Sequence, residues 1–384
     1  MAKNSTAPTT VPDTAWLVRG RHLGPEPEQD LRRNLIALKA AGVLDDFLEL
    51  DPVEAARSTA LYPRDEAADP GPSARRLFEA RWRVADDVTV RAQLTTYDPE
   101  SRRKAGEGVT WVLAAEAERA WDARWPSPAT MFWPDSDRIA WDHETVPGVR
   151  LRTTNHLPKD DGELRRRLRD CARESWLVHV VVHEAMTPDA RGRQPVTAFL
   201  PPSLRHRVVE HRAAPEQVQV ADFALKRELG VGLPRGGAVV LPTVPPAPAD
   251  ADRFTVTNVF LDGTEPTELL GKIVEFASLP QPMPDGAEQA LARLRRGWHL
   301  LTRDEELVHA QAMVTQYATA LEAMTRSCDL YREAAESALA ALAEATGGDG
   351  TPRPTVPEPA RGDASPLALF TKAFGRFRDP NPRK

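Results

Sequence analysis

The chain has 384 residues, of which 41% are hydrophobic and 28% are charged, and its formal net charge is -6 at pH 7. These values are typical of a globular protein with room for two domains of ordinary size. The negative balance argues against a general polyanion binder, so direct contact with nucleic acid is not expected. Two cysteines are too few for a disulfide framework or a CxxC metal site.

Nothing in the sequence predicts a membrane or secretory segment. No apolar run approaches the roughly 20 residues that a transmembrane helix needs. Residues 1–14 are polar, lack the apolar core of a secretory signal, and are expected to be disordered. We therefore expect a cytoplasmic protein without a transmembrane segment.

The N-terminal part of the chain alternates predicted strands and helices. Residues 14–20 predict a strand, and the spacing of Leu31, Leu35 and Leu38 predicts a helix over 31–44. Further along, we expect helices over 51–62 and 116–125, and strands over 84–97, 108–115, 137–144 and 149–157. This pattern indicates an N-terminal α/β region over 15–150, which is rich in Trp over 111–141.

A second α/β region is predicted over 151–284. Residues 160–175 form an amphipathic pattern, and the Val-rich run over 175–186 is typical of a buried central strand. The remaining expected elements are strands over 195–201, 236–242 and 254–261, and helices over 216–229 and 267–277. Interleaved strands and helices predict an α/β or α+β body with a mixed sheet.

Residues 285–346 are predicted to be entirely helical, as a hairpin or a coiled coil. Thr302 and Glu305 form a capping box at the start of a long helix, and Gly347 follows its end. An apolar heptad seam runs along this helix through Leu307, Ala310, Val314, Tyr317, Leu321, Met324, Cys328, Tyr331, Ala335, Ala338 and Leu342. Two interpretations stay open: packing against the helix around 287–296, or a homodimer formed through 302–346.

The C-terminus is predicted to be a tethered docking peptide. Residues 347–364 are a Pro/Gly-rich linker, and Ser365 caps a basic amphipathic segment over 365–384 with five basic residues and one acidic residue. One helical face would carry four apolar residues flanked by two basic ones, namely Leu367, Phe370, Phe374, Phe377, Lys372 and Arg376. This spacing is typical of a helix that binds a groove on a protein partner.

Three other interpretations of this tail stay open. Residues 367–370, Leu-Ala-Leu-Phe, resemble the core of the bacterial sliding-clamp-binding peptide, Gln-Leu-x-Leu-Phe, with Pro366 where that motif has Gln. The resemblance covers five residues and implies an extended peptide rather than a helix. The tail could instead dock on the body of its own chain, or lie on a membrane surface.

The histidines are weak candidates for catalysis. His179 and His183 are four residues apart and Glu184 follows, but on a strand this spacing separates the two imidazoles by ~13 Å. One ion cannot join them, so we predict no metal and no cofactor. His206 and His211 lie downstream and could approach in space.

Aromatic residues offer one further candidate site. Trp121 and Trp125 would share a face of the predicted helix and could form a ligand platform, although core packing is the usual role of such residues. Cys171 and Cys328 fall on helical apolar faces and are interpreted as structural. No GxSxG, Walker-type or HExxH motif occurs.

The sequence therefore predicts a non-catalytic adaptor or accessory protein, built for assembly through its long helix and its C-terminal peptide. A role in a bacterial multi-protein defence cassette is a hypothesis by exclusion. The alternative is an enzyme, either a hydrolase or a nucleic-acid-processing enzyme, with a pocket in the α/β body near His179, His183 and the Trp-rich segment.

Overall fold

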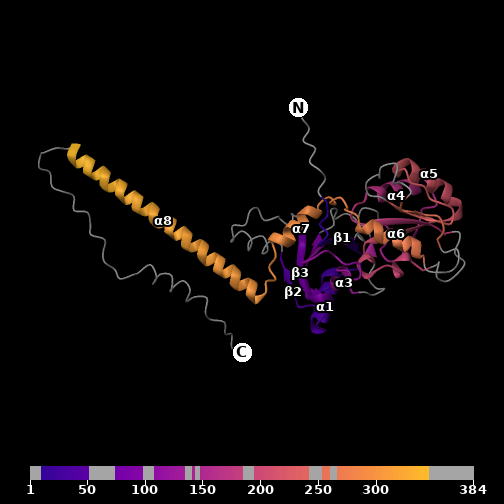
Figure 1. Cartoon of the computed structure of the whole chain (residues 1–384), viewed down its shortest axis with the longest axis horizontal. Coiled ribbons are helices and arrows are strands. Elements are labelled where there is room, and N and C mark those ends of the chain that lie inside the picture. The colour runs from indigo at the N-terminus through magenta and orange to yellow at the C-terminus, as the bar shows by residue number, and fades with distance from the viewer. Residues whose placement is uncertain are drawn as a thin grey trace. The chain divides into compact units, whose positions relative to one another are not determined.

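The structure is a computed structural model of the chain. It describes residues 10–51, 74–97, 108–134, 141–142, 148–184, 194–241, 253–259 and 266–345. The chain divides into two compact units, residues 1–303 and 304–384. The first unit holds two sheets with their helices, and the second holds one long helix (Figure 1).

The first sheet has six strands in the order β2-β3-β4-β5-β1-β6, and all its pairs are antiparallel. The strands are β1 (Ala15–His22), β2 (Asp46–Leu50), β3 (Ala74–Val84), β4 (Val88–Tyr97), β5 (Val109–Ala117) and β6 (Trp141–Asp142). Sequence patterns did not predict β2 or β3. The expected helix over 116–125 is wrong, because β5 continues through Ala117 and the chain after it forms turns.

Helices cover both faces of this sheet. They are α1 (Pro27–Ala40), α3 (Ala129–Phe132) and α7 (Ala287–Arg296). Side chains alternate along β5, so Trp111 and Glu116 lie on opposite faces. Trp111 contacts Trp133, which follows α3, with ring centroids 5.7 Å apart, and Glu116 pairs with Arg295 of α7 at 2.6 Å. Figure 1 shows α7 on one side of the strands of this sheet and α1 and α3 on the other.

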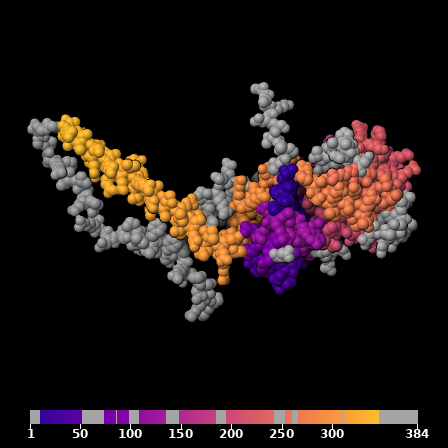
Figure 2. All heavy atoms as spheres, viewed as in Figure 1, coloured from indigo at the N-terminus to yellow at the C-terminus, as the bar shows by residue number. Residues whose placement is uncertain are grey.

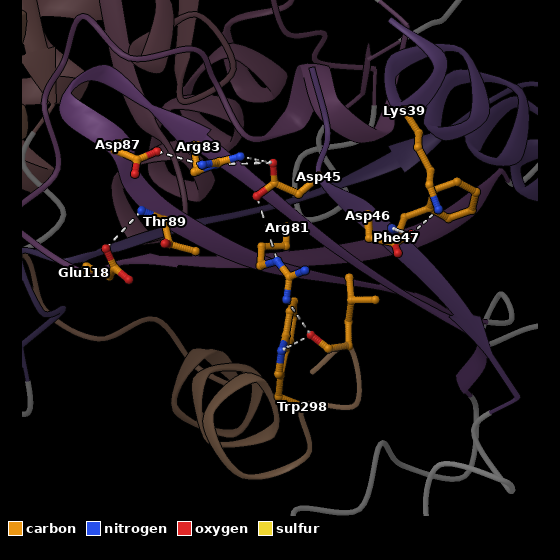
Figure 3. Close-up of polar contacts among 11 residues, drawn as sticks. Lys39, Asp45, Asp46, Phe47, Arg81, Arg83, Asp87, Thr89, Glu118 and Trp298 are labelled. Atoms are coloured by element: carbon orange, nitrogen blue, oxygen red, sulfur yellow. Dashed lines mark hydrogen bonds and ion pairs between the residues drawn. The ribbon is translucent and has the colours of Figure 1, made fainter. Parts of the chain in front are cut away.

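A buried carboxylate fixes the segment that follows α7. Glu79 of β3 is fully buried and accepts hydrogen bonds from the backbone N–H groups of His299 and Leu300, at 2.8 and 2.9 Å. Arg81 of β3 and the Trp298 indole both donate to the carbonyl oxygen of Leu300 (Figure 3). The sheet therefore holds the chain in place shortly before α8 begins.

Ion pairs surround the start of β2 and the end of β3, beside the half-buried ring of Phe47. Arg83 pairs with Asp45 and Asp87, and Lys39 of α1 pairs with Asp46 (Figure 3). Charged side chains at a sheet edge oppose strand addition by another chain. We therefore do not place an interaction surface at this edge.

The second sheet has five strands in the order β11-β10-β8-β9-β7. They are β7 (Thr154–His156), β8 (Val178–His183), β9 (Val208–Ala213), β10 (Ala238–Leu241) and β11 (Thr255–Val256). β9 lies parallel to both β8 and β7, whereas β10 is antiparallel to β8 and to β11. The predicted central strand is confirmed, but the expected strand over 195–201 is wrong, because residues 196–198 form a 3-10 turn.

Helices also cover both faces of the second sheet: α4 (Asp161–Arg173) and α5 (Val218–Leu229) on one, α6 (Thr267–Ser278) on the other (Figure 1). Val181 packs in the cluster that includes α4 and α5, whereas Val180 packs with Ile273 of α6. The Asp160 side chain caps α4 by accepting from the backbone N–H of Glu163. Among its described residues the first unit also forms the 3-10 helices Ala85–Asp87, Val196–Ala198, Pro202–Leu204 and Pro215–Gln217.

The second unit contains α8 (Arg303–Ala345), a single helix of 43 residues. Figure 2 shows α8, coloured orange to yellow, as a single extended helix. An α/β body followed by a long helix confirms the predicted fold class. None of the described helices is both long and apolar enough to span a bilayer. The predicted helix over 51–62, the linker and the C-terminal peptide lie outside the described residues.

Candidate functional site

The seam of α8 is the most extensive exposed apolar surface that the sequence predicted. Its large side chains are exposed by 58–75%: Leu307, Val314, Tyr317, Leu321, Met324, Tyr331 and Leu342. Together with Ala310, Cys328, Ala335 and Ala338 they recur at alternating spacings of four and three residues, so they share one helical face. A row of this length is more than the scattered surface hydrophobics of an ordinary protein.

Small and polar residues flank this seam in a regular way. Ala318, Ala320, Ala334 and Ala341 lie beside it, where small side chains let a second helix approach closely. Charged residues occupy the opposite side, where Glu322 pairs with Arg326 at 3.6 Å, with both side chains at least 70% exposed. Most large apolar side chains of α8 therefore lie on the seam, although Val308 and Leu330 are exposed on the side that carries the charged residues.

The other helix of the predicted hairpin uses its apolar face elsewhere. Leu291 and Leu294 of α7 are buried in the core cluster of the first sheet. Arg293 of α7 also donates to the Tyr97 hydroxyl of β4 at 3.0 Å. The apolar face of α7 is thus occupied by the sheet.

Three of the candidate histidines, His179, His183 and His211, lie on the second sheet, and His206 lies in the turn before β9. His179 and His183 belong to β8 and are 1% and 6% exposed, and as strand residues four apart they share the face toward α4 and α5. In the β8–β9 register His211 lies opposite Val181, so it is a diagonal neighbour of His179. His211 is completely buried.

Two of these histidines meet a cysteine in a buried cluster. The Nδ1 atom of His179 lies 3.0 Å from Nε2 of His211, and the Sγ atom of Cys171 lies 3.4 Å from the same Nε2. The two imidazole rings stack with centroids 5.2 Å apart. Burial raises the pKa of the Cys171 thiol to about 12, so without a ligand it stays protonated. Cys171 was interpreted as structural from its place on the apolar stripe of α4.

The remaining catalytic candidates do not join this cluster. The Nδ1 atom of His183 accepts a hydrogen bond from the backbone N–H of Gly236, and its pKa is lowered by burial and by Arg235. Glu184 pairs with His156 at 3.5 Å near the end of β7. His206 is buried, and burial with the nearby Arg152 and Arg205 lowers its pKa to about 3. The five candidates therefore form no single catalytic constellation.

Sequence reasoning missed a buried ion pair on β9. Arg212 donates to Glu210 at 2.7 Å, and both side chains are almost completely buried. Glu210 also accepts from the backbone N–H of Val196, and burial raises its pKa. The residues Glu-His-Arg at 210–212 look solvent-exposed in sequence, which is why β9 was not predicted.

The predicted tryptophan platform is present only in part. Trp121 and Trp125 do not lie on a helix but meet edge to face in a turn, with ring centroids 5.4 Å apart. Trp125 is 4% exposed and belongs to the core. Trp121 instead lines a cavity of about 470 Å³ between the N-terminal segment, residues 203–207 and the end of α6.

This cavity is lined by one cation, Arg207, and by one acidic residue, Asp13. Arg207 lines it, and its Nε atom is buried and has no hydrogen-bond partner among the described residues. Burial alone lowers the pKa of the guanidinium to about 10. The indole Nε1 of Trp121 is also buried without a hydrogen-bond partner in the described part of the chain. Both groups are donors, so the cavity favours a ligand that carries acceptors.

The predicted tail residues, Leu367, Phe370, Lys372, Phe374, Arg376 and Phe377, lie outside the described residues. Comparison with known proteins adds no relative, because no protein-family model, curated protein or solved structure matches this chain. Its function is therefore argued from its own residues.

Proposed function

We propose that this chain is an assembly protein of the adaptor class, which pairs with a second copy of itself through the α8 seam and binds other proteins through its C-terminal peptide. The observation that supports the proposal is the exposed seam, whose seven large side chains are 58–75% exposed. Apolar side chains arranged at heptad spacing contribute little to a solvated helix but stabilise a helix pair.

A second copy of α8 is the occupant that best matches this face. The seam keeps a strict heptad period along the helix, so an identical helix offers a matching period. Closed pairs of identical chains are the commonest oligomers, and each copy would cover the other. Covering one large apolar side chain contributes ~1.5–3 kcal/mol, so seven can offset the ~4–15 kcal/mol that association costs.

The oligomeric state tests this pairing. Sedimentation of the full chain should give a dimer, and Leu321→Asp should make it monomeric, because a carboxylate would be buried in the seam. Leu330→Asp is the matched control: Leu330 is 66% exposed on the same helix but lies off the seam. A monomeric wild-type chain at high micromolar concentration, or an equal effect of both substitutions, would exclude self-association through α8.

Cys328 can report the orientation of the pair. It lies on the seam and is exposed, whereas Cys171 is buried. In a parallel pair the two Cys328 thiols face each other and should form a disulfide under mild oxidation. In an antiparallel pair centred on the seam they lie ~10 Å apart along the axis and should not. Cys328→Ser should abolish any cross-link.

The C-terminal peptide is proposed to bind a protein groove with an acidic rim, through the apolar face formed by Leu367, Phe370, Phe374 and Phe377. Capture with the full chain should lose its specific partner when Phe370 and Phe374 become Ala, which removes two anchors worth ~1.5–3 kcal/mol each. Leu369→Ala separates the two peptide interpretations. It lies off the helical face but within the extended Leu-x-Leu-Phe pattern, so only the extended form should be weakened by it.

A second candidate function is ligand binding in the body, favoured by the cavity that holds Arg207 and Trp121. Two donors in the cavity, Nε of Arg207 and Nε1 of Trp121, have no hydrogen-bond partner among the described residues, which favours a ligand with acceptors, and the cavity is large enough for a small carboxylate. Thermal shift with benzoate, glutarate and inorganic phosphate tests this function. At least one of them should raise the melting temperature of the wild type but not of Arg207→Met, and no shift with any of them would remove this candidate.

A further inference from the structure

A buried thiol and two imidazoles converge between α4 and the second sheet. We propose that Cys171, His179 and His211 together bind one thiophilic metal ion, with Zn²⁺ as the best candidate. The three side chains are at most 1% exposed, and their ligand atoms all lie within 4.8 Å of one another. This cluster is separate from the α8 seam and from the cavity of Arg207.

Three separate elements bring these ligands together. His179 and His211 come from neighbouring parallel strands and face the same side of the sheet. Cys171 comes from α4, one turn beyond the buried Leu168 on the stripe that packs on that side. Sequence separations of 40 residues between Cys171 and His211 and of 32 between the two histidines explain why local spacing gave no metal motif.

The distances match the requirements of a tetrahedral ion. With Zn–S near ~2.3 Å and Zn–N near ~2.0–2.1 Å, neighbouring ligand atoms lie ~3.5 Å apart for S···N and ~3.3 Å for N···N. In the cluster, Sγ of Cys171 lies 3.4 Å from Nε2 of His211, and Nδ1 of His179 lies 3.0 Å from the same Nε2. The third pair, the Cys171 Sγ atom and the His179 ring nitrogen, lies within 4.8 Å, so the thiol and this imidazole would have to move toward each other to share one ion.

The donor set selects the kind of metal. One thiolate and two imidazoles suit Zn²⁺ or copper, whereas Mg²⁺ and Ca²⁺ require oxygen ligands. Binding would displace the proton of the Cys171 thiol into solvent, and the thiolate would neutralise one charge of the ion. The ion would join α4 to β8 and β9 through three protein ligands and would keep a fourth position for a water molecule or another ligand.

Metal content and cobalt spectroscopy of the full chain test the proposal. Protein produced with added zinc should carry one equivalent of Zn²⁺, and the metal-free chain should take up one equivalent of Co²⁺ with a thiolate-to-cobalt charge-transfer band. Cys171→Ala should remove the band, and His211→Gln should lower the affinity at least ~10-fold. Cys328→Ser and His183→Gln are the matched controls, because Cys328 is exposed and His183 bonds to Gly236 instead.

The wild-type chain alone can overturn the proposal even if the variants fail to fold. Metal-free protein should melt at a higher temperature when Zn²⁺ is added, because an ion bound only by the folded chain stabilises it. A wild type that takes up neither Zn²⁺ nor Co²⁺, and does not shift in melting temperature, excludes the site. A cobalt band that survives in Cys171→Ala would place the ion elsewhere and would equally reject it.

Discussion

Two helices of this protein have similar apolar patterns, but the apolar side chains of α6 are buried and those of α8 are exposed. In α6, Leu269, Ile273 and Phe276 recur at helical spacing and are buried against the second sheet. In α8, Leu321 and its neighbours follow the same kind of spacing and stay more than half exposed. The periodicity therefore determines that a helix forms and which face is apolar, but not what covers that face. For α8 we propose that a second copy of the same helix supplies the cover.

Four predictions test this contrast between buried and exposed groups, each with a matched partner. All nine tryptophans lie at or before Trp298, so tryptophan fluorescence in urea follows the unfolding of the body and not of α8. Unless another quantity is named, each effect below is the change in the free energy of unfolding of the body, measured by tryptophan fluorescence in urea.

The largest effect is expected at the buried ion pair of β9. Arg212→Met should lower the free energy of unfolding by ~3–5 kcal/mol, because it leaves the Glu210 carboxylate buried without its cation. Arg326→Met, which breaks an exposed pair on α8, should leave the body unchanged and cost at most ~0.5 kcal/mol of helix stability. Burial raises the pKa of Glu210, so the Arg212→Met deficit should shrink as the pH falls and Glu210 becomes protonated. A deficit that is independent of pH would contradict this account.

Replacing a large apolar side chain by Ala should lower the free energy of unfolding of the body when the side chain belongs to α6 but not when it belongs to α8. Ile273→Ala should cost ~2–5 kcal/mol, since Ile273 is completely buried and its loss leaves a cavity against the sheet. Leu321→Ala should change the unfolding of the body by less than ~0.5 kcal/mol, because its side chain is 61% exposed. Its effect should appear instead in the dimer dissociation constant. Equal losses of stability in the two variants would show that α8 packs on the body.

Replacing a buried carboxylate of the first sheet should lower the free energy of unfolding more than replacing an exposed one just after β5. Glu79→Ala should cost ~1.5–3 kcal/mol, because the N–H groups of His299 and Leu300 lose their charged acceptor. Glu118→Ala removes one exposed bond to the N–H of Thr89 (Figure 3) and should stay within ~0.5 kcal/mol. If both variants behave alike, Glu79 does not anchor the segment that leads to α8.

The smallest effect is the acid sensitivity that His206 contributes. Its pKa is about 3 in the folded chain and returns toward ~6.5 on unfolding, so the unfolded chain binds this proton first. Stability that is complete above pH ~6.5 is lost as the pH falls, by ~2 kcal/mol between pH 7 and pH 5. His206→Gln should remove this part of the pH dependence. His156→Gln, at an exposed side chain, should retain it.

Local patterns predicted much of this fold correctly. The α4, α5, α6 and α8 helices and the central strand β8 were expected close to their observed places, because each has a clear apolar period of its own. Patterns failed where tertiary contacts override them. The chain over 116–125 has helical spacing, yet β5 continues into it because β1 and β4 pair with β5 as far as its last residues. Strand β9 was missed because Glu210, His211 and Arg212 look solvent-exposed in sequence, whereas Glu210 and Arg212 pair with each other and His211 meets His179 and Cys171.

The sequence by itself determined the apolar seam of α8 but not its exposure, since every residue of the seam lies on one helix and only the heptad period is needed to place it. It also supplied His179, His211 and Trp121 as candidates, but not their partners. Only the tertiary structure decided that β9 lies beside β8, that α4 brings Cys171 to the same point, and that Arg207 shares a cavity with Trp121. The physical reason is that these contacts join elements far apart in sequence, and a periodic pattern records which face is buried but not which residues meet there.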